Sequence, residues 1–348
     1  DGTTTKTETK PDGTVTETVT KPDGTETVTE TKPDGTVTET VSTPDGSKTT
    51  TETKPDGSSM AETTKPDGST GLVTVDVNGK TEAKAVISDG TIEDARNNGT
   101  MIELPIEVKS EKDSNSAPTV NIDLGAPTGT DVSVEIPVSN VTPGTVAVLV
   151  HEDGTEEILK SSRTTENGVQ IRMDGSATVK IVDNSKDFSD TQNHWSKDSV
   201  DFVTSRGLFS GVGKDQFGVG SPMTRGMVNT VLARLAGVDT APAPGQQWYE
   251  VGMQWAKDNG ISDGTNPLGN VTREQFAALL YRFDGAPEVR GDLTFRDAND
   301  ISSYAEDAML WAVQNGIISG VGDERVAPKA NANREQVAAM MERYLMRL

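Results

Sequence analysis

The sequence predicts a multidomain protein in which a Thr-rich repeat region and an all-β, sandwich-like domain precede a helical region. Three observations predict this order. An eleven-residue repeat with a Pro-Asp-Gly turn covers residues 1–70, short strands with turn signals cover residues 71–183, and one helical unit recurs three times within residues 187–348. All 15 aromatic residues lie at or after Phe188. A core with large buried rings is therefore expected only in the last region.

Composition excludes several function classes. The formal net charge is −22, which argues against nucleic acid and anionic membrane as partners, because both attract clustered positive charge. The absence of cysteine excludes disulfides, thiolate metal sites and cysteine nucleophiles. No run of 18 apolar residues is present, so no membrane insertion is expected. No signal peptide is recognisable and the chain begins within a repeat, so we interpret it as a fragment or a processed product.

The first region, residues 1–70, repeats the dipeptide Asp-Gly every 11 residues, with Thr, Val, Glu and Lys alternating between the turns. Asp-Gly favours tight turns, and Thr and Val favour extended backbone. Both faces of such strands would be polar, so little apolar burial offsets the entropy of ordering. Two alternatives follow, a solvated β-meander or an extended, mostly disordered stalk, and either would act as a spacer. Calcium binding is not expected, because each turn offers a single Asp.

The second region, residues 71–183, contains eight or nine short strands at the spacing of a sandwich. Asn78-Gly79 and Asp174-Gly175 mark hairpins. A short helix is expected at residues 91–97. Strands are expected at residues 73–77, 81–87, 101–108, 119–124, 132–138, 146–150, 156–160, 169–173 and 177–182. His151, at a strand end beside a turn, is interpreted as a surface residue.

The helical unit of the third region has three copies, at about 187–238, 245–285 and 292–348. Each copy has a helix that ends at a glycine typical of a C-cap, namely Gly207, Gly260 or Gly316. Aromatic residues stand five and twelve positions before each glycine, which predicts one buried helix face. These pairs are Phe202 with Trp195, Trp255 with Trp248, and Trp311 with Tyr304.

A second helix follows in each copy, beginning at Thr224-Arg225, Thr272-Arg273 and Asn333-Arg334. Thr and Asn are good N-caps, and Gln275 and Gln336 complete capping boxes. Apolar residues follow at helical spacing, and a further arginine stands nine positions after the first in all three copies.

The arginine in the first turn is unfavourable beside the positive end of the helix dipole, by about 0.3–1 kcal/mol at an exposed site. Two explanations remain open: a salt bridge to a carboxylate of the chain, or an anion site. The free N–H groups of a helix N-terminus and a planar guanidinium would together suit a carboxylate or phosphate. The preceding glycine loops would let a ligand approach the backbone, and exposed aromatic faces nearby would suit sugar rings.

These residues resemble the S-layer homology (SLH) domain in three tandem copies. The resemblance is based on Phe188-Ser-Asp190, His194-Trp195, the Gly-Leu/Ile-x-x-Gly segments and Thr-Arg at the second helix. It implies an all-α pseudo-trimer with a central helix bundle. It also implies that grooves between the repeats bind a pyruvylated secondary cell-wall polymer or a peptidoglycan-linked glycan at the surface of a bacterial cell.

The resemblance implies ligand-binding roles for eight residues, which are Arg225, Arg273, Arg334, Gly211, Gly264, Gly320, Asp190 and Trp195. The second copy departs furthest from the family pattern. It lacks the Phe-x-Asp opening, and its loop from Gly260 to Arg273 is shorter than its counterparts. We therefore expect this copy to contribute least to binding.

The sequence thus predicts a non-catalytic anchor in the cell wall or S-layer. No HExxH, GxSxG or Walker motif is present, and we expect no catalytic residue, cofactor or metal site. Two alternatives remain: an adhesin that binds through residues 71–183, and the non-catalytic tail of an extracellular glycan-active enzyme whose catalytic domain lies before Asp1.

Overall fold

The computed structural model describes residues 2–348. The chain forms two compact units, residues 1–184 and 185–348, which are described separately below. Within the described residues, no helix has the length and apolar character needed to cross a membrane.

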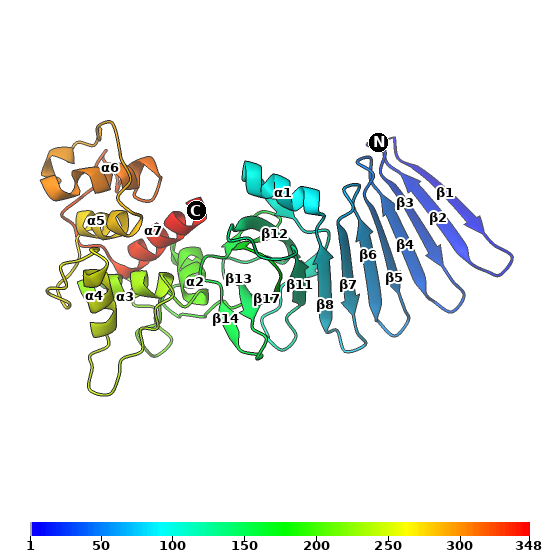
Figure 1. The fold of residues 1–348 in the computed structure, drawn as a ribbon, viewed down its shortest axis with the longest axis horizontal. Helices are drawn as coiled ribbons and strands as arrows, with labels where there is room; N and C mark the ends of the chain where they lie inside the picture. Colours follow the sequence, from blue (N-terminus) through cyan, green and yellow to red (C-terminus); the bar gives the residue numbers. More distant parts are fainter. Residues whose placement is uncertain (1) are drawn as a thin grey trace. The chain divides into compact units, whose positions relative to one another are not determined.

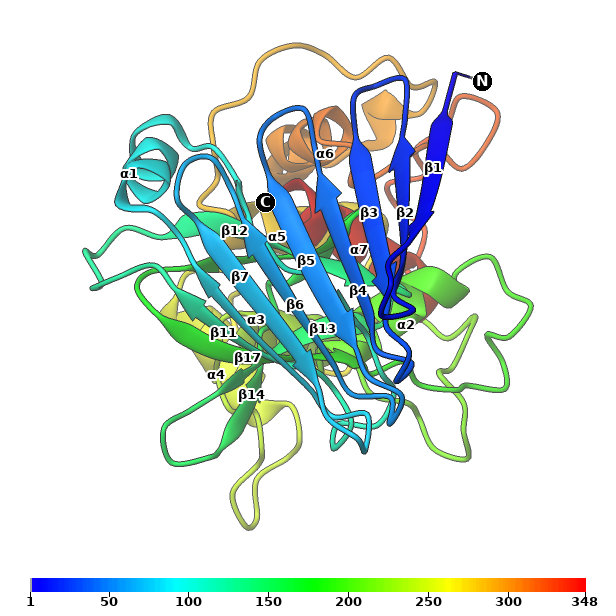
Figure 2. The ribbon, with the colours of Figure 1, turned by 90° about the vertical axis from the view of Figure 1, so that its right-hand side faces the viewer.

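The eleven-residue repeats form an antiparallel meander in which every strand pairs with the next (Figures 1 and 2). Its strands are β1 (Thr4–Thr9), β2 (Val15–Thr20), β3 (Glu26–Thr31), β4 (Val37–Ser42), β5 (Lys48–Thr53), β6 (Ser59–Thr64), β7 (Thr70–Val75) and β8 (Thr81–Val86). The turns explain the strict repeat. The carboxylate of Asp34 accepts the N–H of Thr36 at 2.9 Å, and Gly35 has a φ of 86°, which favours glycine.

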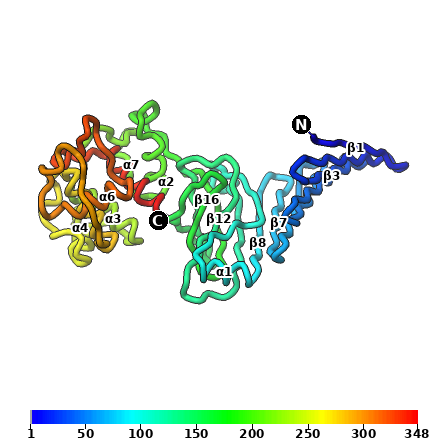
Figure 3. Tube along the Cα trace, turned by 90° about the horizontal axis from the view of Figure 1, so that it is seen from above, coloured from blue at the N-terminus to red at the C-terminus, as the bar shows by residue number. Residues whose placement is uncertain are grey.

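These strands form a single layer, seen edge-on in Figure 3, with solvent-facing polar side chains. Among the described residues before Val73, none belongs to a buried apolar cluster. Backbone ladders and cross-strand threonine contacts hold the layer together, such as the 3.0 Å contact between the hydroxyls of Thr49 and Thr63. Of the two alternatives for this region, the structure contains the β-meander.

The same sheet continues into the sandwich through β8, β11 (Thr119–Asp123), β17 (Ala177–Asp183), β13 (Thr145–Val150) and β14 (Glu156–Ile158). The second sheet contains β9 (Ile102–Glu103), β10 (Val108–Lys109), β12 (Val132–Ser139), β16 (Gly168–Met173) and β15 (Arg163–Thr164). Aliphatic side chains fill the space between them, including Val120, Ile136 and Ile181, all fully buried. Strand β7 crosses the boundary that was expected at residue 70, so the repeats and the sandwich share one sheet.

Two details of this unit differ from the expected elements. The strand expected at residues 101–108 is broken into β9 and β10, with Pro105 between them, because proline cannot donate to a strand ladder. The short strand β15 was not anticipated. The helix α1 (Asp89–Asn98) was expected, and it begins at the N-cap Ser88 and buries Ile92 and Ala95.

The second unit contains three pairs of helices, one pair for each copy of the helical unit (Figure 1). They are α2 (Lys197–Ser205) with α3 (Arg225–Leu235), α4 (Glu250–Asp258) with α5 (Arg273–Phe283), and α6 (Glu306–Gln314) with α7 (Arg334–Arg347). The glycines after the first helices have φ values of 67° to 69°, as expected of C-terminal caps. Both predicted capping boxes are present, at Thr272 and Asn333.

A closed ring of backbone hydrogen bonds joins the segments that precede α3, α5 and α7. Met223 donates to the carbonyl of Ala332 at 2.9 Å, Ala332 donates to Val271 at 2.8 Å, and Val271 donates to Met223 at 2.8 Å. All three residues are fully buried. Each copy of the helical unit therefore contacts both of the others around one centre.

The aromatic residues are divided between the core and the surface. Phe202 and Trp311 are buried and Trp255 is partly buried against the same core, which confirms the core role expected for the position nearer the glycine. The core role expected for the other position is wrong, because Trp195, Trp248 and Tyr304 are 63%, 42% and 52% exposed. These three residues precede the first residue of their helices, so they do not share a helix face with the buried rings.

Candidate functional site

Each first-turn arginine reaches out of its own copy and binds the loop of another copy. The Nε atoms of Arg225, Arg273 and Arg334 donate to the carbonyls of Thr265, Val326 and Phe217, at 3.0, 2.9 and 2.8 Å. The first copy thus binds the second, the second binds the third, and the third binds the first. The arginines are part of the cyclic packing of the unit, and the grooves beside them lie between copies.

The backbone N–H groups at these helix N-termini are not free. The N–H groups of Arg225 and Arg273 donate to the carbonyls of Gly269 and Ala330, at 3.0 and 2.9 Å. The N–H of Arg334 donates to the carbonyl of Ser221 at 2.9 Å. The expectation that free N–H groups would help to bind an anion is therefore wrong, because the loops of the neighbouring copies already take these donors. At Arg225, Arg273 and Arg334 it is therefore the guanidinium group, and not the backbone N–H, that is left to meet an anion.

The groove beside Arg273 has a volume of about 190 Å³ and combines residues of all three copies. Its walls are Arg273 of the second copy, Arg343 and the loop around Gly320 of the third, and the exposed Trp195 of the first. Arg273 uses Nε and Nη2 for the carbonyls of Val326 and Ser319, at 2.9 Å each. Within residues 2–348 its Nη1 atom has no hydrogen-bond partner.

The charges of this groove are not neutralised by carboxylates. Among the described residues, no carboxylate lies within 4.0 Å of the charged nitrogens of Arg273 or Arg343. Burial, and then the positive charge of Arg343, lower the pKa of the Arg273 guanidinium, and the more distant Asp297 offsets this in part. A bound anion would stabilise the charged form of both guanidinium groups. The groove therefore has the electrostatics of an anion site.

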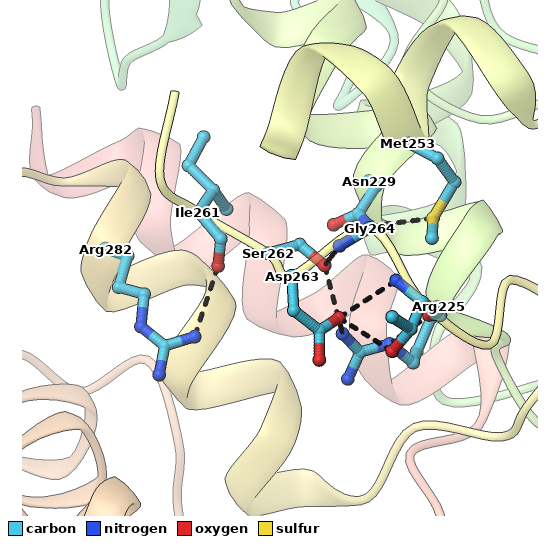
Figure 4. A network of polar contacts seen from close by, with 9 residues as sticks. Arg225, Asn229, Met253, Ile261, Ser262, Asp263, Gly264 and Arg282 are labelled. Carbon is cyan, nitrogen blue, oxygen red and sulfur yellow. Dashed lines mark hydrogen bonds and ion pairs between the residues drawn. The ribbon is translucent and has the colours of Figure 1, made fainter. Parts of the chain in front are cut away.

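The groove beside Arg225 has a similar lining, but it includes the carboxylate of Asp263, whose contact with Arg225 is drawn in Figure 4. Its volume is about 330 Å³, and it is lined by Arg225, Asp263, Arg282 and the exposed ring of Tyr304. Nη2 of Arg225 donates to Oδ1 of Asp263 at 2.5 Å and to Oγ of Ser262 at 3.0 Å. Here the chain supplies its own carboxylate, so the salt bridge left open as an explanation applies to this arginine.

Arg334 is as deeply buried as Arg273, and aromatic and sulfur atoms surround its guanidinium. It is 6% exposed, stacks 4.7 Å above the centre of the Phe217 ring, and donates through Nη2 to the carbonyl of Ser210 at 2.8 Å. Its Nη1 faces the sulfur atoms of Met223 and Met227, both at 3.9 Å. Met227 occupies the helix position of Gln275 and Gln336 in the other copies. The geometry around Arg334 is that of a packing contact.

Asp190 holds a loop in place. Its two carboxylate oxygens accept the N–H groups of Phe217, Gly218 and Val219, at 2.8 to 2.9 Å. Burial acts to raise the pKa of Asp190, but these donors outweigh it and keep the pKa below its ordinary value. Asp297 accepts N–H groups in the same way in the third copy. The Phe-Arg-Asp sequence at residues 295–297 was the signal that could have identified it.

Two of the three predicted glycines are explained by packing. A Cβ atom on Gly211 would lie 2.6 Å from the ring of Phe188, and one on Gly320 would lie 3.2 Å from the ring of Phe295. Gly264 stands at a turn with a φ of 74°. Gly320 also lines the groove of Arg273.

Three groove residues were not among the eight residues expected to bind ligand, namely Arg282, Arg343 and Asp263. The two arginines belong to the position nine residues after the first-turn arginine. There they donate to the carbonyls of Ile261 and Ile317, at 3.2 and 3.3 Å. Their recurrence in every copy was the available signal.

Comparison with known proteins supports the resemblance for part of this unit. The S-layer homology domain family matches residues 187–226 and 294–338. The matched segments include Arg225 and Arg334, whereas α5 and Arg273 lie outside them. The middle copy is thus identified by the internal repeat. S-layer homology domains are non-catalytic modules that anchor proteins to the cell wall.

Curated relatives include surface proteins and enzymes. An S-layer protein sap of Bacillus anthracis is 28% identical over 160 residues, covering 42% of this chain and 19% of that protein. An amylopullulanase of Thermoanaerobacterium thermosulfurigenes is 28% identical over 172 residues, covering 45% of this chain and 9% of that protein. An exoglucanase XynX of Acetivibrio thermocellus is 26% identical over 177 residues, covering 46% of this chain and 16% of that protein. The aligned parts are small fractions of these relatives. The matches indicate a location at the cell surface or in the cell wall.

Proposed function

We propose that residues 187–348 are three S-layer homology repeats, packed as a pseudo-trimer, that dock the chain onto a pyruvylated secondary cell-wall polymer. The observation that carries this proposal is the groove of Arg273 and Arg343, where two guanidinium groups face a cavity without a carboxylate partner. A pyruvyl ketal carries one carboxylate on a sugar ring. The carboxylate matches the guanidinium charge, and the exposed indole of Trp195 offers an apolar face to the sugar.

In this proposal the three grooves are unequal. The groove of Arg273 is the principal site, because among the described residues no carboxylate pairs with Arg273 or Arg343. This differs from the expectation that the second copy contributes least, because Arg273 belongs to that copy while the short loop of the same copy lies in the weaker groove of Arg225. Arg225 is already paired with Asp263, and Arg334 is enclosed by Phe217 and two methionine sulfurs. The glycines and Asp190 support the loops that form the groove walls. The β-meander of residues 4–75 would act as a spacer.

A second candidate function is suggested by the relatives. Because an amylopullulanase and an exoglucanase align with this chain, it could be the wall-binding tail of an extracellular glycan-active enzyme. The same docking chemistry would serve this role. The two candidates differ only in what the anchored protein does.

A polymer-binding experiment tests the proposed docking. The full chain is expected to sediment with purified cell-wall sacculi and to bind the released polymer in titration calorimetry. Mild acid hydrolysis of the pyruvyl ketals should reduce this binding by at least tenfold, because the carboxylate then leaves the sugar. Equal binding to treated and untreated polymer would contradict the proposal.

A further inference from the structure

Position 263 distinguishes the loop of the second copy from the other two loops. Aligned on Gly211, Gly264 and Gly320, the residue before the glycine is Ser210 in the first copy, Asp263 in the second and Ser319 in the third. In the first and third copies, this residue offers only its backbone carbonyl to an arginine. Arg334 binds Ser210 in this way at 2.8 Å, and Arg273 binds Ser319 at 2.9 Å.

In the second copy the side chain of Asp263 takes part instead. Its Oδ1 accepts Nη2 of Arg225 at 2.5 Å, as Figure 4 shows. The same oxygen accepts the N–H and the hydroxyl of Thr265, both at 3.0 Å. The carboxylate is therefore held in position by its own loop before any ligand arrives, and it meets the guanidinium as a ligand carboxylate would.

The protonation state of Asp263 supports this arrangement. The backbone N–H of Thr265, its hydroxyl and the charge of Arg225 together outweigh burial and lower the pKa of Asp263. The carboxylate is thus ionised at neutral pH. It is also 63% exposed, so a stronger anion can displace it.

We propose that Asp263 is a built-in competitor that occupies the Arg225 groove and suppresses its binding of anionic ligands. This inference rests on the proposed docking function and names the residue that makes one groove weaker than another. The rest of the groove is complete, with Arg282, the helix face of Gln275 and the exposed ring of Tyr304. A serine at position 263, as in the other two copies, should release Arg225 for ligand.

The test uses the full chain with pyruvylated wall polymer as the probe, in a background where Arg273→Ala weakens the principal groove. Adding Asp263→Ser should raise affinity about two- to fivefold, the range that an exposed ion pair of good geometry supports. Asp258→Ser is the matched control, since it removes the same charge from an exposed helix end outside the Arg225 groove. Adding Arg225→Ala should cancel the gain, and melting curves verify that each variant is folded.

Reactivity of Arg225 toward phenylglyoxal, mapped by mass spectrometry, gives a readout without polymer. The rate should rise in Asp263→Ser and stay unchanged in Asp258→Ser. If the two variants behave alike in reactivity, or if both change polymer affinity equally, Asp263 is not a competitor. If wild-type chain fails to bind polymer while Arg225 becomes more reactive in Asp263→Ser, the docking function fails and the pairing of Asp263 with Arg225 stands.

Discussion

Replacing Arg334 by alanine is expected to lower the free energy of unfolding of residues 185–348 by about 3 kcal/mol. The change leaves the buried carbonyl of Phe217 and the partly buried carbonyl of Ser210 without their donor, and it removes the guanidinium that stacks on Phe217. It also opens the contact between the third and first copies. For a unit of this size the melting temperature should fall by about 6–12 °C.

The fluorescence of tryptophan measures this unit separately, because all 4 Trp residues lie after residue 185. Arg290→Ala is the control, since Arg290 is 85% exposed and forms a surface ion pair that contributes about 0–1 kcal/mol. Arg334→Lys keeps the charge but cannot span both carbonyls, so an intermediate loss is expected. A melting temperature of Arg334→Ala equal to that of Arg290→Ala would show that the cyclic contacts do not hold the unit together.

Replacing Arg273 by alanine is expected to weaken binding of pyruvylated wall polymer at least tenfold, about 1.4 kcal/mol or more. The guanidinium is the centre of the groove, and its Nη1 atom remains available for a ligand carboxylate. Affinity should be measured by calorimetry at a temperature where the variant is folded, because the loop at Ser319–Val326 also loses its anchor.

Two further variants test whether the charge or the planar shape of the Arg273 side chain matters, and whether any surface charge would have the same effect. Arg273→Lys keeps a cation but not the planar fork, so we expect part of the affinity to remain and its salt dependence to persist. Arg296→Ala removes a charge that is 72% exposed and should have little effect. If folded Arg273→Ala binds polymer as tightly as Arg296→Ala does, the groove is not the principal site.

Much of the fold follows from local sequence patterns. Asp-Gly turns, hairpins and helix caps are encoded by neighbouring residues, so β2 to β8, α1 and the caps at Thr272 and Asn333 could be predicted. The single sheet that joins the repeats to the sandwich could not, because pairing of β8 with β11 links residues far apart in the chain. Trp195 shows a second limit: its spacing from Phe202 resembles a helix face, but α2 begins only at Lys197.

The sequence predicted which residues belong to the candidate site better than it predicted which residues of the other copies they contact. Arg273 and Trp195 were each identified from the repeat, but they belong to different copies, and only the cyclic packing brings them to one groove. Arg225 looked the same as Arg273 in sequence. Its pairing with Asp263 depends on which loop lies opposite, and that is a tertiary property. The backbone donors at the helix N-termini were taken by carbonyls for the same reason.

Fluorescence of Trp195 during polymer titration tests most directly whether the wall glycan binds beside Arg273. Because this indole is 63% exposed and lines the groove, binding should change its emission in the wild-type chain. The change should be lost in Trp195→Phe and with polymer stripped of its pyruvyl ketals. An unaltered change in Trp195→Phe would place the bound glycan elsewhere on the protein and contradict this account.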